Sequence, residues 1–451
     1  MSFLRCAASP SRRSCLATGP LMSAVQQQRV ALSNGKPVEA TMTPPADELL
    51  PTLIADRIRP NIRPVVPASS TEGGPRRRLH AIARPCGYYV LSRVAILFAA
   101  LGARWFAPKL HLLSALTTGW DAHWYTLIAQ HGYPHHILNE GHGSRWAFFP
   151  AWPLTIRAAV EVTHLSYVQA TLILSFVLGL TSAIALWLAV REVFGSVVAD
   201  RAVLLYVFFP TAYVLSLGYS EGLFITTCGA CLFALSRRYW ITAALFAVLG
   251  GLTKNFGVVL ITCVVVAAGH AFLTSRKLRP LVAVAIAPLG FAAWLLYSWW
   301  TVGTPFAFVQ AERFWGDSHF VWFTTPILAV IDLFTGIQAL TDGQVVLCAL
   351  GVAFAYGGIV LLSKARDKGV TIPVFWWVFT IGSTLALLSS YEPDSVLRYS
   401  MVVIPVYAAY AWRMRPAWEG PLVGMLGVSQ GMLMLIALIG TLHPQMANLW
   451  P

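Results

Sequence analysis

The chain has 451 residues, of which 57% are hydrophobic and only 11% charged, and its mean hydropathy is +0.64. These values exclude a water-soluble globular chain and indicate a polytopic membrane protein. The net charge of +13 does not require a nucleic-acid partner, because much of it lies in short connectors between apolar runs, where membrane insertion places Lys and Arg.

The first part of the chain, residues 1–86, is rich in Pro, Arg and Ser and contains runs such as GGPRRR. A segment of this composition cannot form a buried hydrophobic core, so we predict a disordered, basic cytoplasmic tail. The opening residues lack a long apolar stretch, which argues against a secretory signal. A transit peptide, or a later translation start at Met22 or Met42, are alternatives.

Apolar runs recur from Tyr88 onward, and they predict an all-α membrane domain over 87–442, followed by a short outward tail, 443–451. A crossing needs about 20 apolar residues, which gives about eleven transmembrane helices. The predicted segments are 88–106, 168–190, 202–217, 221–236, 240–253, 256–274, 281–302, 344–363, 371–389, 400–412 and 420–441. The third to fifth and the tenth are short or run together.

The connectors between these segments alternate in charge, and this alternation predicts the orientation. One set is basic and is therefore predicted to be cytoplasmic: Arg76–Arg78, Arg84, Arg191, Arg201, Arg237, Arg238, Arg276, Lys277, Arg279, Lys364, Arg366, Lys368, Arg413 and Arg415. The other set is predicted to face outward and holds isolated bases among the acids Asp121, Glu140, Glu161, Glu221, Glu312, Asp317, Glu392 and Asp394.

Four of the seven cysteines lie inside predicted spans, two of them in the pattern CGAC, Cys228 to Cys231. This spacing resembles a redox motif, but a thiol exchanger needs an exposed context. Among neighbours such as Ile225 and Leu232, small side chains at lipid depth favour helix packing. We therefore predict that these cysteines are packing residues.

The first outward loop, 107–167, is too long and too patterned for a simple connector. It contains WDAHWYTLIAQHGYP (Trp120–Pro134) and RWAFFPAWP (Arg145–Pro153). In the first stretch Trp120, Trp124, Leu127 and Ile128 form one helical stripe, with His123, Thr126 and Gln130 on the other flank. The pattern predicts interfacial helices whose aromatic residues anchor Asp121 at headgroup depth. Alternatively, Asp121 simply caps a helix that starts near Gly119.

The histidines of this loop, His131, His135, His136 and His142, suggest a zinc cluster, but their spacing fits no defined ligand pattern. We therefore predict no metal and a polar loop with glycine turns.

Together, WDAHWYTLIAQHGYP and AFFPAWPL resemble the first luminal loop of the PIG-V-like mannosyltransferases, including their bacterial relatives. Further similar stretches follow in order across most of residues 118–410: FFPTAYVLSLGYSEGLF (Phe208–Phe224), LTKNFGVVL (Leu252–Leu260), GTPFAFVQAERFWG (Gly303–Gly316) and LRYSMVVIPVY (Leu397–Tyr407). The basic tail lies outside the resemblance.

The resemblance implies a C-type glycosyltransferase fold (GT-C-like) and an outward-facing active site that uses a polyprenyl or dolichyl phosphate sugar, here mannose. An inverting displacement needs a base for the acceptor hydroxyl, and Asp121 is the only acid in the WD motif. The leaving group is already a phosphate, so cations need only stabilise its charge. No cofactor and no divalent metal are expected.

The predicted ligands of the donor phosphate are bases on the outward side: Lys254, Arg398 and Arg145. Lys254 stands where the family usually has Arg, in the pattern KNFG, so a point charge replaces a bidentate contact. Snorkelling or interfacial anchoring is the alternative for Lys254 and for Arg398 with Tyr399.

Glu221 either binds sugar hydroxyls or favours a helix start. The predicted sugar and acceptor residues are Trp120, His123, Trp124, Tyr125, His131, Glu221, Asn255 and Tyr399.

The predicted partners are membrane lipids, the lipid-phosphate sugar donor and a glycolipid acceptor. The predicted location is a bacterial plasma membrane, or the endoplasmic reticulum if the chain is eukaryotic. The sequence does not specify the acceptor, the linkage or the oligomeric state.

A transporter or flippase for a lipid-linked or small polar substrate is the alternative function. Such a protein places its ionisable residues in the middle of the bilayer and often has internal repeats, and we find no such repeat.

Overall fold

The computed structural model describes residues 75–141, 143–314, 323–335, 343–389 and 395–442. All of them lie in one compact unit, residues 65–451. Within these ranges every regular element is a helix, which confirms the predicted all-α class. The tails 1–74 and 443–451, predicted as a disordered cytoplasmic segment and a short outward segment, lie outside the described residues.

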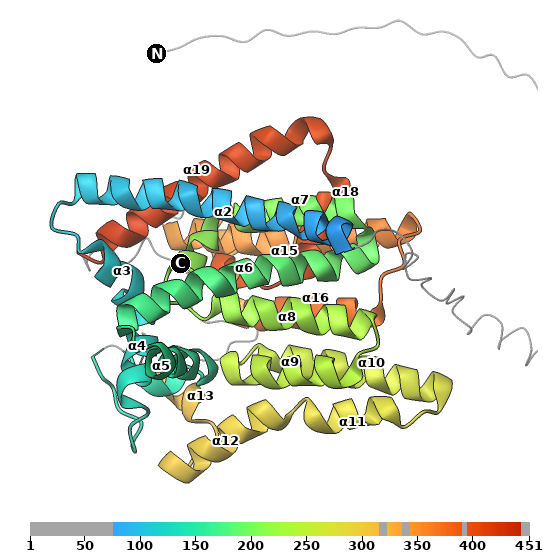
Figure 1. The fold of residues 1–451 in the computed structure, drawn as a ribbon, viewed down its shortest axis with the longest axis horizontal. Helices are drawn as coiled ribbons and strands as arrows, with labels where there is room; N and C mark the ends of the chain where they lie inside the picture. The colour runs from blue at the N-terminus through green and yellow to red at the C-terminus, as the bar shows by residue number, and fades with distance from the viewer. Residues whose placement is uncertain (1–74, 142, 315–322, 336–342, 390–394, 443–451) are drawn as a thin grey trace, which may run out of the picture. The chain divides into compact units, whose positions relative to one another are not determined.

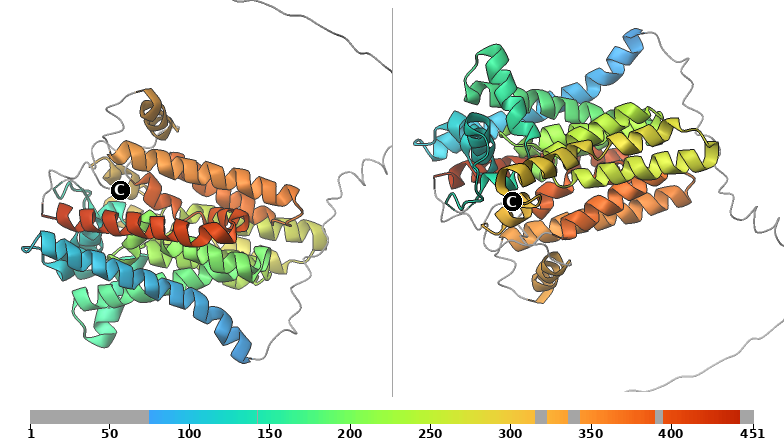
Figure 2. Two further views of the ribbon diagram at one scale, coloured as in Figure 1. Left: turned by 90° about the horizontal axis from the view of Figure 1, so that it is seen from above. Right: turned by 90° about the horizontal axis from the view of Figure 1, so that it is seen from below.

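The longest helices run side by side (Figures 1 and 2). They are α2 (Pro75–Phe106), α6 (Tyr167–Phe194), α10 (Gly257–Ser275), the pair α11 (Arg279–Ile286) and α12 (Leu289–Val302), α15 (Gly343–Asp367) and α19 (Pro416–Gly440). Shorter helices lie among them: α7 (Ser196–Val207), η3 (Pro210–Ser216), α8 (Glu221–Ser236), α9 (Trp240–Thr253), α14 (Thr324–Thr335), α16 (Val374–Leu388), α17 (Val396–Ser400) and α18 (Ile404–Arg413).

The predicted outward loop, 107–167, matches the connection between α2 and α6. It folds into three α-helices and a 3₁₀ turn: α3 (Leu112–Thr118), α4 (Asp121–His131), η2 (Arg145–Ala147) and α5 (Ala151–Thr163). A further short helix, α13 (Ala307–Glu312), packs against η2. The helices predicted for this loop are therefore present.

The predicted count of eleven crossings is not confirmed. Each of the eleven segments coincides with one or more helices, but only six described spans are long and apolar enough to cross a bilayer. The bent pair α7–η3 would make a seventh. Helices α8, α9 and α16 have 16, 14 and 15 residues, fewer than the roughly 20 that a crossing requires. The chain is a multi-pass membrane protein whose described part is all-helical, with short helices packed between long ones.

The first helix begins earlier than the sequence predicted. Helix α2 starts at Pro75, so it includes the last residues of the predicted tail, 75–86. Proline is favoured in the first turn of a helix, where its missing N–H needs no partner. The apolar span itself begins only at Ile82. The basic residues that precede it extend the helix without lengthening its hydrophobic part.

The basic and acidic connectors lie at opposite ends of the bundle (Figure 1). The α6–α7, α8–α9, α10–α11, α15–α16 and α18–α19 connections, at or beside which the predicted basic set lies, are at one end; α3, α4, α5 and α13 are at the other. The predicted alternation of charge is therefore present in the fold. Asp317, Glu392 and Asp394, also predicted at the acidic end, lie outside the described residues.

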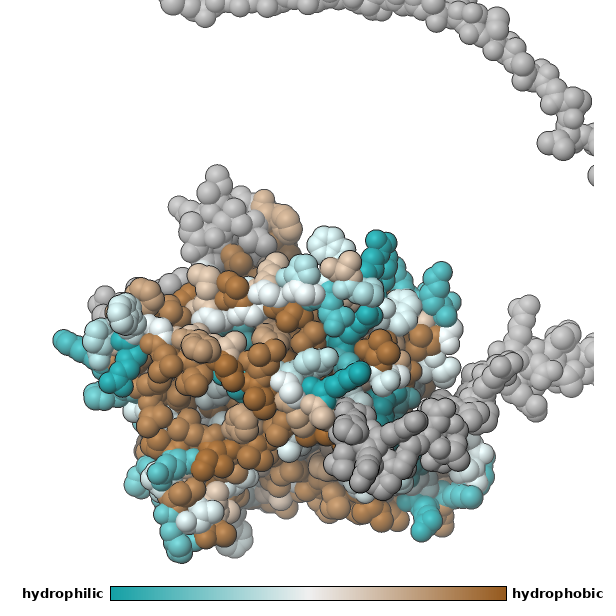
Figure 3. Space-filling model, turned by 45° about the horizontal axis from the view of Figure 1, so that its top comes forward, coloured by the Kyte–Doolittle hydropathy of each residue, from teal (hydrophilic) through white to brown (hydrophobic). Residues whose placement is uncertain are grey.

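On the face that Figure 3 shows, the surface between these two ends is largely apolar. Large hydrophobic side chains on α2 and α12, such as Phe98, Leu101 and Leu296, are at least half exposed. A soluble monomer rarely exposes so much continuous apolar surface. This band is the part of the protein that lipid covers.

Helices α6 and α8 make an unusually close contact, because glycines on α8 leave room for the α6 backbone. A Cβ at Gly222 would lie 3.1 Å from the backbone nitrogen of Gly179, and one at Gly229 would lie 2.6 Å from the carbonyl carbon of Ala185. Small residues at such contacts let helix backbones pack directly. The start of α8 is therefore held in a fixed position, which matters for the site described below.

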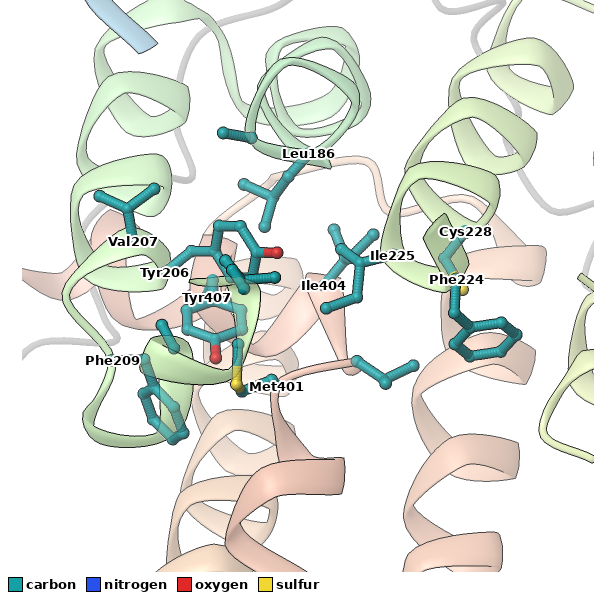
Figure 4. Close-up of a cluster of buried hydrophobic side chains, with 14 of the residues drawn as sticks. Leu186, Tyr206, Val207, Phe209, Phe224, Ile225, Cys228, Met401, Ile404 and Tyr407 are labelled. Carbon is teal, nitrogen blue, oxygen red and sulfur yellow. The ribbon is translucent and has the colours of Figure 1, made fainter. Parts of the chain in front are cut away.

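Cys228 and Cys231 are completely buried in α8. Figure 4 shows Cys228 beside Phe224 in the apolar core, where Tyr206 and Tyr407 also meet. This burial confirms their predicted role as packing residues.

Helix α7 breaks before η3 with a bend of 78°. Arg93 of α2 is buried at this break, where its guanidinium donates hydrogen bonds to the carbonyl oxygens of Val207 and Ala212 and to the Ser216 hydroxyl. Gln430 of α19 also donates to the Val207 carbonyl. These side chains satisfy backbone groups that the break leaves without helical partners.

Candidate active site

Asp121 is the first residue of α4. The N-cap position is taken by Trp120, whose φ of 53° is unusual for a residue other than glycine, and this cap has no side-chain hydrogen bond. A carboxylate in the first turn is favoured by the helix dipole. The Asp121 side chain does not act as the cap, because its Oδ2 accepts a hydrogen bond of 2.6 Å from Arg398 instead.

Arg398 lies in α17, 277 positions further along the chain, and its side chain is only 5% exposed. One terminal nitrogen donates to Asp121, and the other donates to the hydroxyls of Ser395 and Tyr399. Burial raises the pKa of Tyr399 to about 12, so this hydroxyl stays protonated at physiological pH. The guanidinium is thus fixed in one orientation by three side chains.

Glu221 is the first residue of α8, and its side chain is 2% exposed. Its Oε1 accepts a 2.7 Å hydrogen bond from Lys254 and lies 3.8 Å from Nε of Arg398. A buried carboxylate needs charged or polar partners to stay ionised. Glu221 therefore joins the two cations into one network.

Lys254 lies in the break between α9 and α10, with an extended backbone. The position of the break depends on Gly257, because a Cβ there would lie 2.5 Å from the backbone of Gly250. This close approach explains why a glycine follows the basic residue at short distance. The Asn255 side chain is exposed, and its Oδ1 accepts a hydrogen bond from the Phe256 amide.

Five predicted site residues are thus brought together from four separate segments: Asp121, Glu221, Lys254, Arg398 and Tyr399. The Tyr399 ring faces both cations, with Lys254 Nζ 4.9 Å and Arg398 Cζ 4.9 Å from its centroid. We call the four charged side chains Asp121, Arg398, Glu221 and Lys254 the charge quartet.

Arg145, the third predicted phosphate ligand, belongs to a different ion pair. Its guanidinium binds the Glu140 carboxylate at 2.6 Å and donates to the Gly132 carbonyl. Partial burial tends to raise the pKa of Glu140, but the hydrogen bonds and charge of Arg145 outweigh this and hold the pKa below its usual value. This pair closes the loop between α4 and η2. His131, a predicted sugar ligand at the end of α4, is exposed.

The aromatic residues of α4 face the protein interior. The prediction that they anchor the helix at headgroup depth is wrong for Trp124 and Tyr125, which are 9% and 5% exposed. Trp124 stacks on Phe148, and the Tyr125 hydroxyl is hydrogen-bonded to Ser220, next to Glu221. Thr126, predicted on the polar flank, is buried and donates to the Thr117 carbonyl. Packing against α5 and α8 turns these side chains inward, so Trp124 and Tyr125 position the site.

An open pocket of ≈ 500 Å³ lies beside the start of α4, between α3 and the end of α19. It contains two of the predicted sugar and acceptor residues, Trp120 and His123. The polar residues of its lining that the sequence analysis missed are His111, Ser114, Thr118 and Thr441. They come from segments with no motif of their own, so only the fold identifies them.

Metal binding is not indicated in the described part of the chain. No group of three or more His, Cys, Asp or Glu side chains there could hold an ion. His142, one of the four histidines considered for zinc, lies outside it.

Residues 109–316 match the family model described as Mannosyltransferase (PIG-V). This segment contains the whole of α4 and the starts of α8 and α10. Over residues 109–316 the chain is therefore similar to the PIG-V mannosyltransferase family.

Curated relatives agree with this similarity. Human GPI alpha-1,6-mannosyltransferase 2 is 31% identical over 203 residues, which are 42% of this chain and 39% of the human protein. The enzyme of the same name from Cricetulus griseus is 27% identical over 323 residues, 66% of this chain and 58% of that protein. The chain thus spans less than two thirds of the length of these relatives.

Among solved structures, ArnT from Cupriavidus metallidurans bound to undecaprenyl phosphate is similar, with a TM-score of 0.48 and 15% identity over 80% of this chain and 72% of ArnT. An Archaeoglobus fulgidus oligosaccharyltransferase with a tethered acceptor peptide has a TM-score of 0.43 and 12% identity over 80% of this chain and 55% of that protein.

The segment that matches the family model includes three members of the charge quartet, Asp121, Glu221 and Lys254. Arg398 and its neighbour Tyr399 lie beyond it, on α17. The quartet is therefore completed by a residue from outside the matched segment, and the fold brings that residue to Asp121.

Proposed function

We propose that the protein is a membrane glycosyltransferase that transfers mannose from polyprenyl or dolichyl phosphate mannose to a lipid-linked glycan. The observation that supports this most strongly is the charge quartet. It pairs a partly exposed carboxylate, Asp121, with Arg398, and Glu221 links Arg398 to a second cation, Lys254, at one end of a lipid-embedded bundle. A carboxylate beside cations suits a reaction in which a hydroxyl loses a proton and a phosphate leaves.

In the proposed reaction the acceptor hydroxyl gives its proton to Asp121 as its oxygen attacks the anomeric carbon of mannose. The bond between that carbon and the phosphate oxygen breaks, so the configuration inverts and the electron pair stays on the lipid phosphate. Arg398 occupies Oδ2 of Asp121, and Oδ1 has no hydrogen-bond partner among the described residues. Oδ1 is therefore the oxygen that takes the proton in this proposal.

The phosphate is proposed to bind at Lys254, whose side chain is 12% exposed, with Arg398 behind it. Two positive charges in a site of low dielectric stabilise the charge that develops on the leaving oxygen. The phosphate needs no protonation to leave, so the proposal requires neither a general acid nor a divalent metal. Arg145 is not assigned to the phosphate, because it is paired with Glu140.

The acceptor is proposed to enter through the pocket at Trp120 and His123. An indole ring offers a flat apolar surface to a sugar ring, and the pocket's histidines and hydroxyls can exchange hydrogen bonds with sugar hydroxyls. Trp120 and His123 flank Asp121 in the sequence, so a glycan held there lies near the proposed base.

The acidic end of the bundle is proposed to face outward from a bacterial plasma membrane, because the opposite connectors carry the Lys and Arg residues. Cysteines introduced one at a time at His135 and Lys368 test this, because both residues are exposed and follow α4 and α15, which end at opposite ends of the bundle. In intact cells a membrane-impermeant maleimide should label His135→Cys and spare Lys368→Cys, with the wild type as background. The reverse labelling would contradict the orientation.

The transferase proposal is tested with purified protein in nanodiscs, radiolabelled polyprenyl phosphate mannose, a crude lipid extract and EDTA. We expect the wild type to move label into a new lipid, and Asp121→Asn to lose this activity by about a thousandfold, within the range for a general base. Glu161→Gln, at an exposed carboxylate on α5, is the matched control and should retain full activity. Full activity of Asp121→Asn would refute the assignment of Asp121 as the general base. Movement of substrate across vesicles without covalent transfer would instead indicate a flippase.

A further inference from the structure

Glu221 is the only described carboxylate with a recorded ion pair to both cations of the site. It binds Lys254 at 2.7 Å and lies 3.8 Å from Arg398 Nε. The sequence suggested that Glu221 contacts sugar hydroxyls or begins a helix. In the structure its side chain contacts both cations and is almost completely buried.

The backbone on both sides of Glu221 is held rigidly. On one side Ser220 is hydrogen-bonded to Tyr125 of α4, and on the other Gly222 packs directly against the α6 backbone. A small shift of α8 therefore cannot move Glu221 away from Lys254 and Arg398. The ion pair is a fixed feature of the site to which other groups must adapt.

Glu221 is not placed in the way that gives the greatest stability. Its second carboxylate oxygen, Oε2, is buried and has no hydrogen-bond partner among the described residues. Arg398 Nε, on the other side of the 3.8 Å contact, likewise lacks a hydrogen bond. Buried polar atoms without partners cost free energy, so such a pair needs an explanation other than stability.

The charges of the quartet cancel, since Asp121 and Glu221 are negative and Arg398 and Lys254 are positive. An arriving phosphate must therefore share Lys254 and Arg398 with a carboxylate that already holds them. An ammonium has three donors, so Lys254 can bind a phosphate and Glu221 together. The repulsion between phosphate and Glu221 then weakens the binding.

This repulsion differs between donor and product. The sugar donor is a phosphodiester with one negative charge, whereas the lipid phosphate that leaves is a monoester with a second ionisation near pH 6 and a charge approaching −2 at neutral pH. Two cations with no competing carboxylate would hold the product more tightly than the donor. Such a site would be inhibited by its own product.

We propose that Glu221 is a positioning residue that competes with the lipid phosphate for Lys254 and Arg398, and so promotes release of the product. This inference rests on the proposed function, because it assumes a lipid-phosphate leaving group. It assigns Glu221 no contact with sugar and no part in proton transfer.

The test is equilibrium binding of radiolabelled undecaprenyl phosphate to the purified full-length protein in nanodiscs, which needs no turnover. We expect Glu221→Gln, which keeps the shape and removes the charge, to bind this lipid about tenfold more tightly than the wild type. Steady-state transfer should show kcat and the KM for the donor falling together, with stronger product inhibition. A residue that merely supports the fold would instead raise KM or leave it unchanged.

Four further variants keep the test decisive. Glu161→Gln should bind undecaprenyl phosphate like the wild type, because this carboxylate is exposed on α5. Lys254→Gln should bind it more weakly, and adding Glu221→Gln to that variant should give a smaller gain than in the wild type, because the competition is for Lys254. Glu221→Asp, which keeps the charge, should stay closer to the wild type than Glu221→Gln.

The outcomes separate this inference from the transferase proposal. If the wild type binds undecaprenyl phosphate and a folded Glu221→Gln variant binds it equally or more weakly, the competition is refuted while the transferase proposal stands. If the wild type does not bind the lipid phosphate, the donor assignment fails and this inference fails with it.

Discussion

Arg93 and Arg398 are both buried arginines in a lipid-embedded bundle, but their partners differ. Arg93 donates to two backbone carbonyls and a serine hydroxyl at the break between α7 and η3. Arg398 donates to a carboxylate and lies near a second one. The first arginine completes the hydrogen bonds of an interrupted helix, and the second joins charged groups from distant segments.

This difference shows that the partners of a buried cation, more than its depth, indicate its role. Carbonyl partners belong to the fold and have no reason to change during a reaction. An incoming anion can replace a carboxylate partner of a cation. A rigid network of such ion pairs also holds charged groups at a defined position. The same substitution at the two positions should therefore have different consequences.

Arg398→Met should have the largest effect on activity. It leaves Asp121 and Glu221 without their shared cation, and breaking a buried ion pair costs about 3–5 kcal/mol. We expect mannose transfer to fall at least a hundredfold while detergent-extracted protein still elutes as a single folded species. Transfer within threefold of the wild type would show that Arg398 is no more than an anchor.

Arg93→Met should affect stability more than chemistry. The carbonyls of Val207 and Ala212 lose a buried donor, which costs about 1–3 kcal/mol. We expect a clearly lower temperature of thermal inactivation in detergent, with the transfer rate per folded molecule close to that of the wild type. If the rate per folded molecule falls as it does for Arg398→Met, the distinction between the two arginines is lost.

Gly257→Ala tests whether the helix break, and not only the lysine, sets the position of Lys254. The added Cβ meets the Gly250 backbone at 2.5 Å, and overpacking of this kind costs about 1–3 kcal/mol. We expect a higher KM for the donor and a moderate loss of stability. Gly269→Ala on the same helix, with nothing within 4 Å of the new Cβ, is the matched control. Equal behaviour of the two variants would contradict this role of the close contact.

Glu140→Gln should have the smallest effect. Because the pKa of Glu140 is lowered in the folded protein, its pair with Arg145 stabilises the loop above the ordinary carboxyl pKa and is lost as the pH falls below about 4. Hydrogen exchange in residues 132–145 should increase over that pH range in the wild type. In Glu140→Gln it should be high at every pH, at a cost of under about 1 kcal/mol. If hydrogen exchange in the wild type does not depend on pH, the Glu140–Arg145 pair does not stabilise this loop.

The arrangement of helices was largely predictable, because hydrophobic length and connector charge are local properties. All eleven predicted segments coincide with helices, and the two charge classes lie at opposite ends. The number of true crossings was not predictable in the same way. Helices such as α9 are sheltered by neighbours, so a short apolar segment can be stable without the length that lipid requires.

The site was predicted as a set of residues but not as an arrangement. Asp121, Lys254 and Arg398 were selected by residue type and predicted side, while their pairing depends on tertiary contacts across as many as 277 positions. Arg145 was selected on the same grounds but is neutralised by Glu140, five residues earlier. The aromatic pattern of α4 led to a wrong prediction, that Trp124 and Tyr125 anchor the helix in the lipid headgroups. An apolar stripe that faces a protein core has the same sequence pattern as one that faces lipid.

The neutrality of the charge quartet also bears on how substrate reaches the site. Four charges that cancel within a few ångströms produce little field beyond the Debye length of about 8 Å in physiological salt. An enzyme that collects a dissolved anion gains speed from a long-range field. The lipid-linked donor proposed above is already confined to the bilayer and would arrive by lateral diffusion. The rate at which this protein binds it should therefore depend little on ionic strength.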